Sequence, residues 1–204
     1  MKNRILILSF LLLIQVNSIS AQQKTSSVQD EFEDTIDVPS KLLSWIKTFN
    51  KEINNFFSAE KCDKLKRELG YIRTDLRSYL TLRKKLTDTL ERHNYKYEFD
   101  PATKKKLNKI WDKMSFRLEK MLPELSTPLQ EETSEIIGIT QLRLRSNARV
   151  FVSKLDYLLD DKKVDRVKFR TESKKTYEDL TQTLQMITRA QVNLEKKAKE
   201  LSSQ

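Results

Sequence analysis

Residues 177–201 read YEDLTQTLQMITRAQVNLEKKAKEL, and apolar side chains recur along them at every third or fourth position. This spacing puts one narrow apolar stripe on a single face of an α-helix, as in helices that pack like coiled coils. The members of the stripe are Tyr177, Leu180, Leu184, Ile187, Leu194, Ala198 and Leu201, with Gln191 in the same phase. No stretch of comparable length alternates polar and apolar residues as a half-buried strand does. The sequence therefore predicts an all-α protein.

The same rhythm recurs in four further segments, whose stripes begin at Leu42, Cys62, Leu107 and Ile137. We expect five helices, over residues 40–57, 59–93, 101–122, 128–160 and 164–202. Short connections make neighbouring helices antiparallel. The predicted architecture is an elongated up-and-down bundle of about five helices with coiled-coil-like heptad packing.

Several helix boundaries carry a chemical signal. Asp100 and the proline that follows it read as an N-cap and a first helical residue that needs no N–H donor. Ser40 and Ser58 are candidate N-caps of the first two helices, and Thr127 with Gln130 resembles a capping box. The turn at 160–164 rests only on a run of charged residues, so the sequence leaves open whether it separates the last two helices.

The N-terminus reads as a targeting segment followed by an acidic arm. Lys2 and Arg4 precede the apolar run Ile5–Val16, and small residues end at Ala21, so residues 1–21 are expected to be a cleaved secretory signal peptide. The run is shorter than the roughly 20 residues that span a bilayer. Residues 22–38 hold five acidic residues and one basic residue and are expected to form a flexible arm. Residues 39–204 would then form a single helical domain in a periplasmic or extracellular protein.

The composition argues against an enzyme. Two glycines exclude a glycine-rich phosphate loop, and one histidine with one cysteine is too few for a zinc site or an internal disulfide. His93 is expected to continue the core phase of its helix, and no catalytic set can be assembled around it. Cys62 is either a small core residue, in phase with its helix's stripe, or a thiol for an intermolecular disulfide. We therefore expect no catalytic residues, no metal and no cofactor.

Basic residues gather at one end of the predicted bundle. Residues 83–109 contain nine basic and four acidic residues, and residues 160–175 contain seven and four. An antiparallel bundle would bring these two connections together. The candidate anion-binding residues are Lys84, Lys85, Lys104, Lys105, Lys106, Lys162 and Lys163. Tyr95, Tyr97 and Phe99 form a candidate aromatic loop at the same end, where the rings either stack on a ligand or plug the core.

Two functions follow from these patterns. The first is an exported, non-catalytic protein-interaction or scaffold module that binds a protein partner or a second copy of itself through amphipathic helices. It is motivated by the regular stripe of 177–201 and by the aromatic residues Trp45, Phe49, Phe56 and Phe57. The alternative is a polyanion binder whose basic end takes an acidic glycan, a lipid headgroup surface or nucleic acid. The mature chain would have no transmembrane segment in either case.

Overall fold

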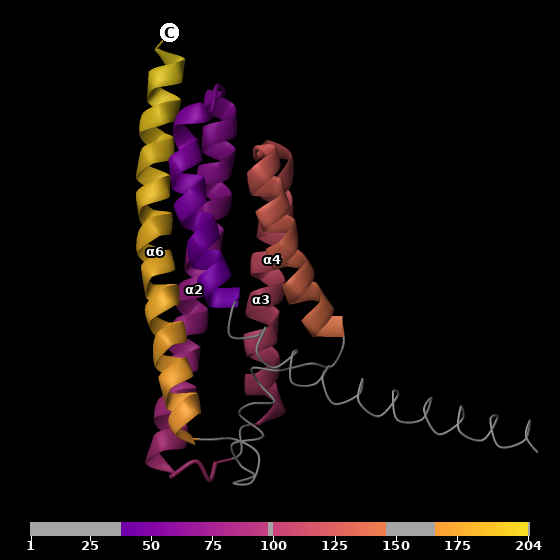
Figure 1. Ribbon diagram of the computed structural model, residues 1–204, viewed down its shortest axis with the longest axis vertical. Coiled ribbons are helices and arrows are strands. Elements are labelled where there is room, and N and C mark those ends of the chain that lie inside the picture. Colours follow the sequence, from indigo (N-terminus) through magenta and orange to yellow (C-terminus); the bar gives the residue numbers. More distant parts are fainter. Residues whose placement is uncertain (1–37, 98–99, 146–165, 204) are drawn as a thin grey trace, which may run out of the picture. The chain divides into compact units, whose positions relative to one another are not determined.

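The computed structural model describes residues 38–97, 100–145 and 166–203, and this part of the chain contains five α-helices packed against each other and no strand (Figure 1). The first helix covers residues 38–52 and is followed by a short 3-10 helix, η1 (Ile53–Asn55). The others are α2 (Ala59–Arg92), α3 (Pro101–Met121) with the 3-10 helix η2 (Leu122–Glu124), α4 (Thr127–Arg145) and α6 (Arg166–Ser202). The prediction of an all-α protein is confirmed.

The caps proposed for α2 and α3 are present. Ser58 Oγ accepts a hydrogen bond of 3.2 Å from the backbone N–H of Lys61 at the start of α2. Asp100 accepts from the backbone N–H of Thr103 at 2.8 Å and from its hydroxyl at 2.7 Å, ahead of Pro101 at the first helical position. These bonds satisfy N–H groups that have no partner within the helix. The predicted starts of both helices are therefore correct.

Two other predicted boundaries are wrong. The first helix begins by Val38, which is buried, so the arm expected over 22–38 cannot include this residue. Ser40 consequently lies inside the helix, where its hydroxyl donates to Asp179 Oδ2 at 2.7 Å instead of capping. Thr127 is already the first residue of α4, and the Gln130 amide donates to the carbonyl of Leu125 at 3.0 Å. A capping box would instead have Gln130 accept from a backbone N–H.

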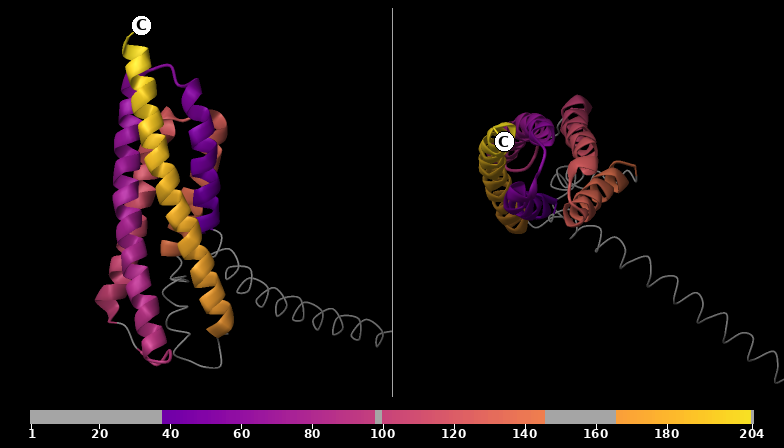
Figure 2. Two further views of the ribbon diagram at one scale, coloured as in Figure 1. Left: turned by 90° about the vertical axis from the view of Figure 1, so that its left-hand side faces the viewer. Right: turned by 90° about the horizontal axis from the view of Figure 1, so that it is seen from above.

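α2 and α6 pack side by side and run in opposite directions. Lys66 near the start of α2 pairs with Glu195 near the end of α6, with an N–O distance of 3.3 Å. Glu91 near the end of α2 pairs with Arg170 near the start of α6 at 3.2 Å. The residue numbers of the paired positions thus increase along α2 and decrease by the same amount along α6. Figure 2 shows α6 lying against both α2 and the 38–52 helix.

The 38–52 helix is fixed to α4 on one side and to α6 on the other. Trp45 Nε1 donates to the hydroxyl of Thr133 in α4 at 2.8 Å. Asn50 Nδ2 donates to the carbonyl of Met186 in α6 at 3.2 Å. Trp45 and Phe49 of this helix and Phe56, just after η1, are buried in the shared core, and the ring centroids of Trp45 and Phe49 lie 5.5 Å apart. Phe57 is 86% exposed.

The stripe of α6 is also part of the core. Leu180, Ile187, Ala190 and Leu194 are all completely buried, and Tyr177 at the start of the stripe is 42% exposed. Burial of this kind removes apolar surface from water, which is the main favourable contribution to folding. Apart from Phe57 and Tyr177, the residues of these two segments that motivated a partner-binding role are therefore largely covered within the chain itself.

All described residues belong to one compact unit, Asp37–Gln204. Within the described ranges, no helix combines the length and the hydrophobicity that crossing a bilayer requires. The expected signal peptide, the arm up to residue 37 and the expected turn at 160–164 lie outside the described residues.

Candidate anion-binding groove

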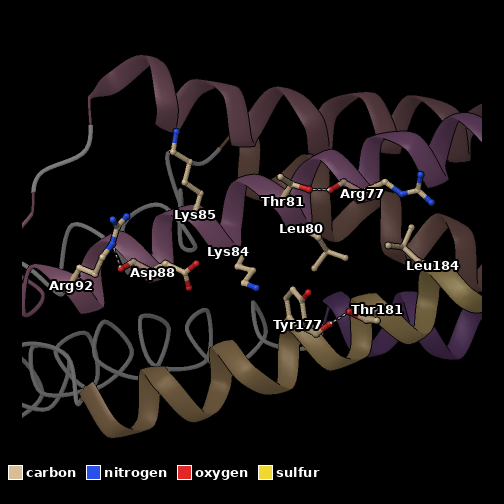
Figure 3. Close-up of a pocket in the computed structure, with 10 residues that line it drawn as sticks. All are labelled: Arg77, Leu80, Thr81, Lys84, Lys85, Asp88, Arg92, Tyr177, Thr181 and Leu184. Carbon is tan, nitrogen blue, oxygen red and sulfur yellow. Dashed lines mark hydrogen bonds between the residues drawn. The ribbon is translucent and has the colours of Figure 1, made fainter.

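A groove follows the seam between the second half of α2 and the first half of α6 (Figure 3). It consists of a cavity of about 440 Å³ and an adjoining cavity of about 190 Å³, which share Lys84, Asp88 and Tyr177. In Figure 3 the Lys84 side chain extends from α2 toward the ring of Tyr177 on α6. The larger cavity is lined by Arg77, Leu80, Thr81, Lys84, Lys85, Asp88, Arg92, Tyr177, Thr181 and Leu184. The smaller cavity is lined by Arg83, Lys84, Thr87, Asp88, Glu91, Arg170, Ser173, Lys174 and Tyr177.

The helix register explains why these residues meet. Lys84 and Asp88 are one turn apart on α2, and Tyr177 and Thr181 are one turn apart on α6, so each pair lies on one face of its helix. The antiparallel register set by Lys66–Glu195 and Glu91–Arg170 then brings the two faces together. Leu80, which is 6% exposed, forms part of the floor of the larger cavity.

The charges of the groove are unbalanced. Seven of its lining residues are basic, and only Asp88 and Glu91 are acidic. Within the described ranges, no carboxylate oxygen lies within 4.0 Å of the side-chain nitrogens of Arg77, Lys84, Lys85 or Lys174. The groove therefore carries cationic groups that are not paired with any carboxylate of the described residues.

Several basic residues toward the opposite ends of α2 and α6 are paired with acids. Lys64 pairs with Glu124 of η2, and Lys66 pairs with Glu195 of α6. Lys199 also pairs with Glu195, at 3.0 Å, and these two lysines hold the pKa of Glu195 below its usual range through hydrogen bonds and charge attraction. Some cations there are thus matched by acids of neighbouring helices or turns, whereas Arg67, Arg189 and Lys197 have no carboxylate oxygen within 4.0 Å among the described residues. Unpaired basic groups therefore also occur outside the groove, and the groove differs in that several of them line one pair of adjoining cavities.

The candidate lysines of the sequence fall into three sets. Lys84 and Lys85 line the groove. Lys105 and Lys106 are exposed in the first turns of α3 and do not line the groove, and the backbone of Lys104 lies in the same turns, whereas its side chain is outside the described part of the structure. Lys162 and Lys163 lie outside the described residues.

The aromatic loop divides between the core and the surface. α2 ends at Arg92, and Asn94 and Tyr95 then adopt left-handed backbone conformations, with φ of 51° and 61°. The Tyr95 N–H donates to the carbonyl of Leu90 at 2.7 Å, which turns the ring inward to 5% exposure. Tyr97 is 38% exposed and packs on the His93 ring, with centroids 4.9 Å apart. Phe99 lies outside the described residues.

Tyr95 therefore closes this end of the core, and the expectation that His93 continues the core phase is wrong. His93 is exposed at the C-cap of α2, because the helix ends one residue earlier and the turn gives the buried position to Tyr95. The Tyr95 hydroxyl also accepts from Arg170 at 3.4 Å, and Arg166 lies 5.2 Å from its ring centroid. The buried Tyr95 side chain thus helps to hold the first turns of α6 beside the groove.

Sequence reasoning missed most of the groove. Arg77, Arg92 and Arg170 line it but adjoin no other Lys or Arg in the sequence, while Arg83 is next to Lys84 and Lys174 is next to Lys175. The available signal was their helical spacing, since Arg77, Lys84 and Asp88 recur on one face of α2. Their partners on α6 follow only from the register between the two helices, which depends on contacts distant in sequence.

The described residues show no arrangement typical of catalysis. They contain no group of three or more His, Cys, Asp or Glu residues placed to hold a metal ion. Cys62 is completely buried, and this burial raises the pKa of its thiol. Comparisons with protein-family models, with curated proteins and with solved structures find no match to the chain.

Proposed function

We propose that the protein is a non-catalytic helical bundle that binds polyanions through the groove between α2 and α6. The observation that carries this proposal is the set of basic side chains, Arg77, Lys84, Lys85 and Lys174, which have no carboxylate partner among the described residues and line two adjoining cavities of one groove. Clustering matters because the Debye length is about 8 Å at physiological salt, so isolated surface cations attract little. A linear polyanion that lies along several such cations releases counterions from its length.

The long antiparallel helices also bear on how the whole bundle is arranged. The antiparallel register of α2 and α6 supports an elongated up-and-down bundle with heptad packing, in which the groove follows one seam. A seam between long antiparallel helices suits a linear ligand better than a compact one. The half-exposed ring of Tyr177 at the centre of the seam offers a flat apolar surface beside the cations.

The ligand would be met outside the cytoplasm if residues 1–21 direct export. The motivation is the pattern of basic residues, short apolar run and small residues described above. An acidic glycan or a surface of anionic lipid headgroups would then be available in the periplasm or outside the cell, and extracellular nucleic acid would compete for the same charges.

One observation favours the protein-interaction module as a second candidate. Tyr71 on α2 and Phe116 on α3 are 49% and 51% exposed, and the Arg117 guanidinium lies 4.2 Å and 5.8 Å from their ring centroids. Exposed aromatic residues grouped with arginine are typical of the residues that dominate protein interfaces. In this case Phe116→Ala would abolish an association measured by light scattering and leave polyanion binding unchanged.

The test of the main proposal compares two charge reversals of equal size. Lys84→Glu with Lys85→Glu alters the groove, and Lys105→Glu with Lys106→Glu alters the exposed start of α3. Heparin affinity is measured for both variants over a range of salt concentrations, after circular dichroism confirms folding. We expect the groove variant to bind far more weakly and to lose about two from the slope of log affinity against log salt. Equal losses in both variants would show that binding follows total charge, and the groove would not be the site.

A further inference from the structure

Ser173 differs from most of the hydroxyl-bearing residues of α6. The hydroxyls of Thr171, Thr181 and Ser202 donate to the carbonyl four residues earlier, at 3.0, 2.7 and 2.9 Å. Ser173 is only 8% exposed, and its Oγ has no hydrogen-bond partner among the described residues. A buried polar atom without a partner is uncommon and calls for a structural explanation.

Ser173 is one of the residues that line the smaller cavity of the groove. Arg83 and Lys84 reach this cavity from α2, and Arg170 and Lys174 reach it from α6. Two independent features therefore coincide: a set of basic side chains from both helices and an unused buried hydroxyl that can donate a hydrogen bond.

We propose that the smaller cavity is a subsite for one tetrahedral oxyanion, a phosphate or sulfate group, with Ser173 Oγ as its neutral donor. The inference deepens the proposed function, because it names the anionic group that the polyanion would carry. Donors enter from two facing helices, and the oxygens of a tetrahedral group point in several directions. The two oxygens of a carboxylate lie in one plane, so they match fewer of these donors. Arginine and lysine both bind phosphate, arginine often through two parallel hydrogen bonds.

Glu91 regulates access to this subsite. Its carboxylate accepts from Arg170 Nε at 3.2 Å, and the pKa of Arg170 is raised by the hydrogen bond to Tyr95 and by the contact with Glu91. A bound oxyanion would share or replace Glu91 as the partner of Arg170. Lys174, the other basic residue of α6 at this cavity, has no carboxylate partner among the described residues.

The test uses the full chain and three polymers: heparin, which carries sulfate esters, polyphosphate, and polygalacturonate, which carries only carboxylates. Ser173→Ala is expected to weaken binding of the first two by about tenfold, the loss produced by one hydrogen bond to a charged group. The salt slope should stay constant, because no charge is removed. Polygalacturonate binding should not change. Ser78→Ala is the matched control, since the exposed Ser78 hydroxyl donates to the carbonyl of Thr74 at 3.0 Å.

A second pair of variants tests the cationic side of the subsite. Lys174 lines the cavity and the adjacent Lys175, exposed on α6, does not. Lys174→Gln should therefore weaken heparin and polyphosphate binding more than Lys175→Gln. Equal effects of the two changes, or a Ser173→Ala variant that binds all three polymers like the unmodified protein, would overturn the subsite while leaving polyanion binding intact.

Binding experiments with inorganic phosphate and sulfate show whether the subsite takes a free anion or only the ester group of a polymer. If no polymer binds but inorganic phosphate shifts the amide NMR signals of Ser173 and Lys174, the subsite stands and binding of polymers is wrong. If the polymers bind and depend on Ser173 while the free anions cause no shift at millimolar concentration, the site takes the ester group of a polymer. If neither free anions nor Ser173→Ala has any effect, the subsite is wrong.

Discussion

Gly70 of α2 and Gln191 of α6 meet across the helix seam: a Cβ on Gly70 would lie 3.0 Å from Gln191 Nε2. This amide donates to the carbonyl of Lys66 at 3.1 Å. Glycine thus leaves room for a polar side chain of α6 to reach the backbone of α2. Gly138 of α4 differs, because a Cβ there would meet no atom within 4 Å.

These two glycines predict different responses to alanine. Gly138→Ala should stabilise the protein by about 1 kcal/mol, the difference in helix propensity between the two residues. Gly70→Ala should gain less, because the new methyl group displaces the Gln191 amide and costs its hydrogen bond. In a protein that already carries Gln191→Ala, no amide lies in the way of the new methyl group, so Gly70→Ala should then increase the free energy of unfolding by the full amount of about 1 kcal/mol. Urea denaturation measures the four free energies, and equal gains for Gly70→Ala in both backgrounds would contradict this contact.

The α6 stripe is predicted to stabilise the isolated chain. Ile187 is completely buried, so Ile187→Ala should lower the free energy of unfolding by roughly 2–5 kcal/mol. Val192 is 63% exposed on the same helix, and Val192→Ala should change the free energy of unfolding by less than about 0.5 kcal/mol. Thermal melts combined with light scattering check both variants. Loss of association without loss of stability in Ile187→Ala would mean that the stripe binds a partner instead.

Cys62 is predicted to be unreactive in the folded protein. It is completely buried and burial raises the pKa of its thiol, so little reactive thiolate is present or reachable near pH 8. Iodoacetamide labelling followed by mass spectrometry should be slow in buffer and complete in denaturant. Because the chain has one cysteine, the label has a single origin. Rapid labelling of the folded protein, or a dimer that disappears on reduction, would favour the intermolecular disulfide.

Removal of the Glu91 charge is predicted to strengthen polyanion binding. Glu91→Gln eliminates one of the two acidic groups of the groove and leaves Arg170 available to the ligand. Heparin affinity should rise, and the rise should shrink at high salt because charge interactions are screened. Glu178→Gln serves as the control, since this exposed residue of α6 does not line the groove. Weaker binding by Glu91→Gln would show that Glu91 acts mainly by positioning Arg170.

The sequence was sufficient for the helices because their signals are local. Apolar spacing located the five segments, and Ser58 and Asp100 marked two starts through bonds to residues three positions away. It was insufficient at Thr127 and His93, where packing and a left-handed turn at Asn94 and Tyr95 decide the boundary.

The groove could be predicted only in part for the same reason. Lys84 and Lys85 were found because they are adjacent in a basic run. Arg77 and Lys174 line the same groove from separate helices, and their meeting depends on the register between α2 and α6. Whether a lysine is neutralised also depends on this register, as Lys66 and Glu195 show.

Lysine footprinting tests polyanion binding by the groove most directly. The folded chain is acetylated with and without saturating heparin, and the modification of each lysine is measured by mass spectrometry. We predict that heparin protects Lys84, Lys85 and Lys174, while Lys175 and the distant Lys196 and Lys199 stay as reactive as in the free protein. Uniform protection of all exposed lysines, or protection of Lys105 and Lys106 without Lys84 and Lys174, would contradict this prediction.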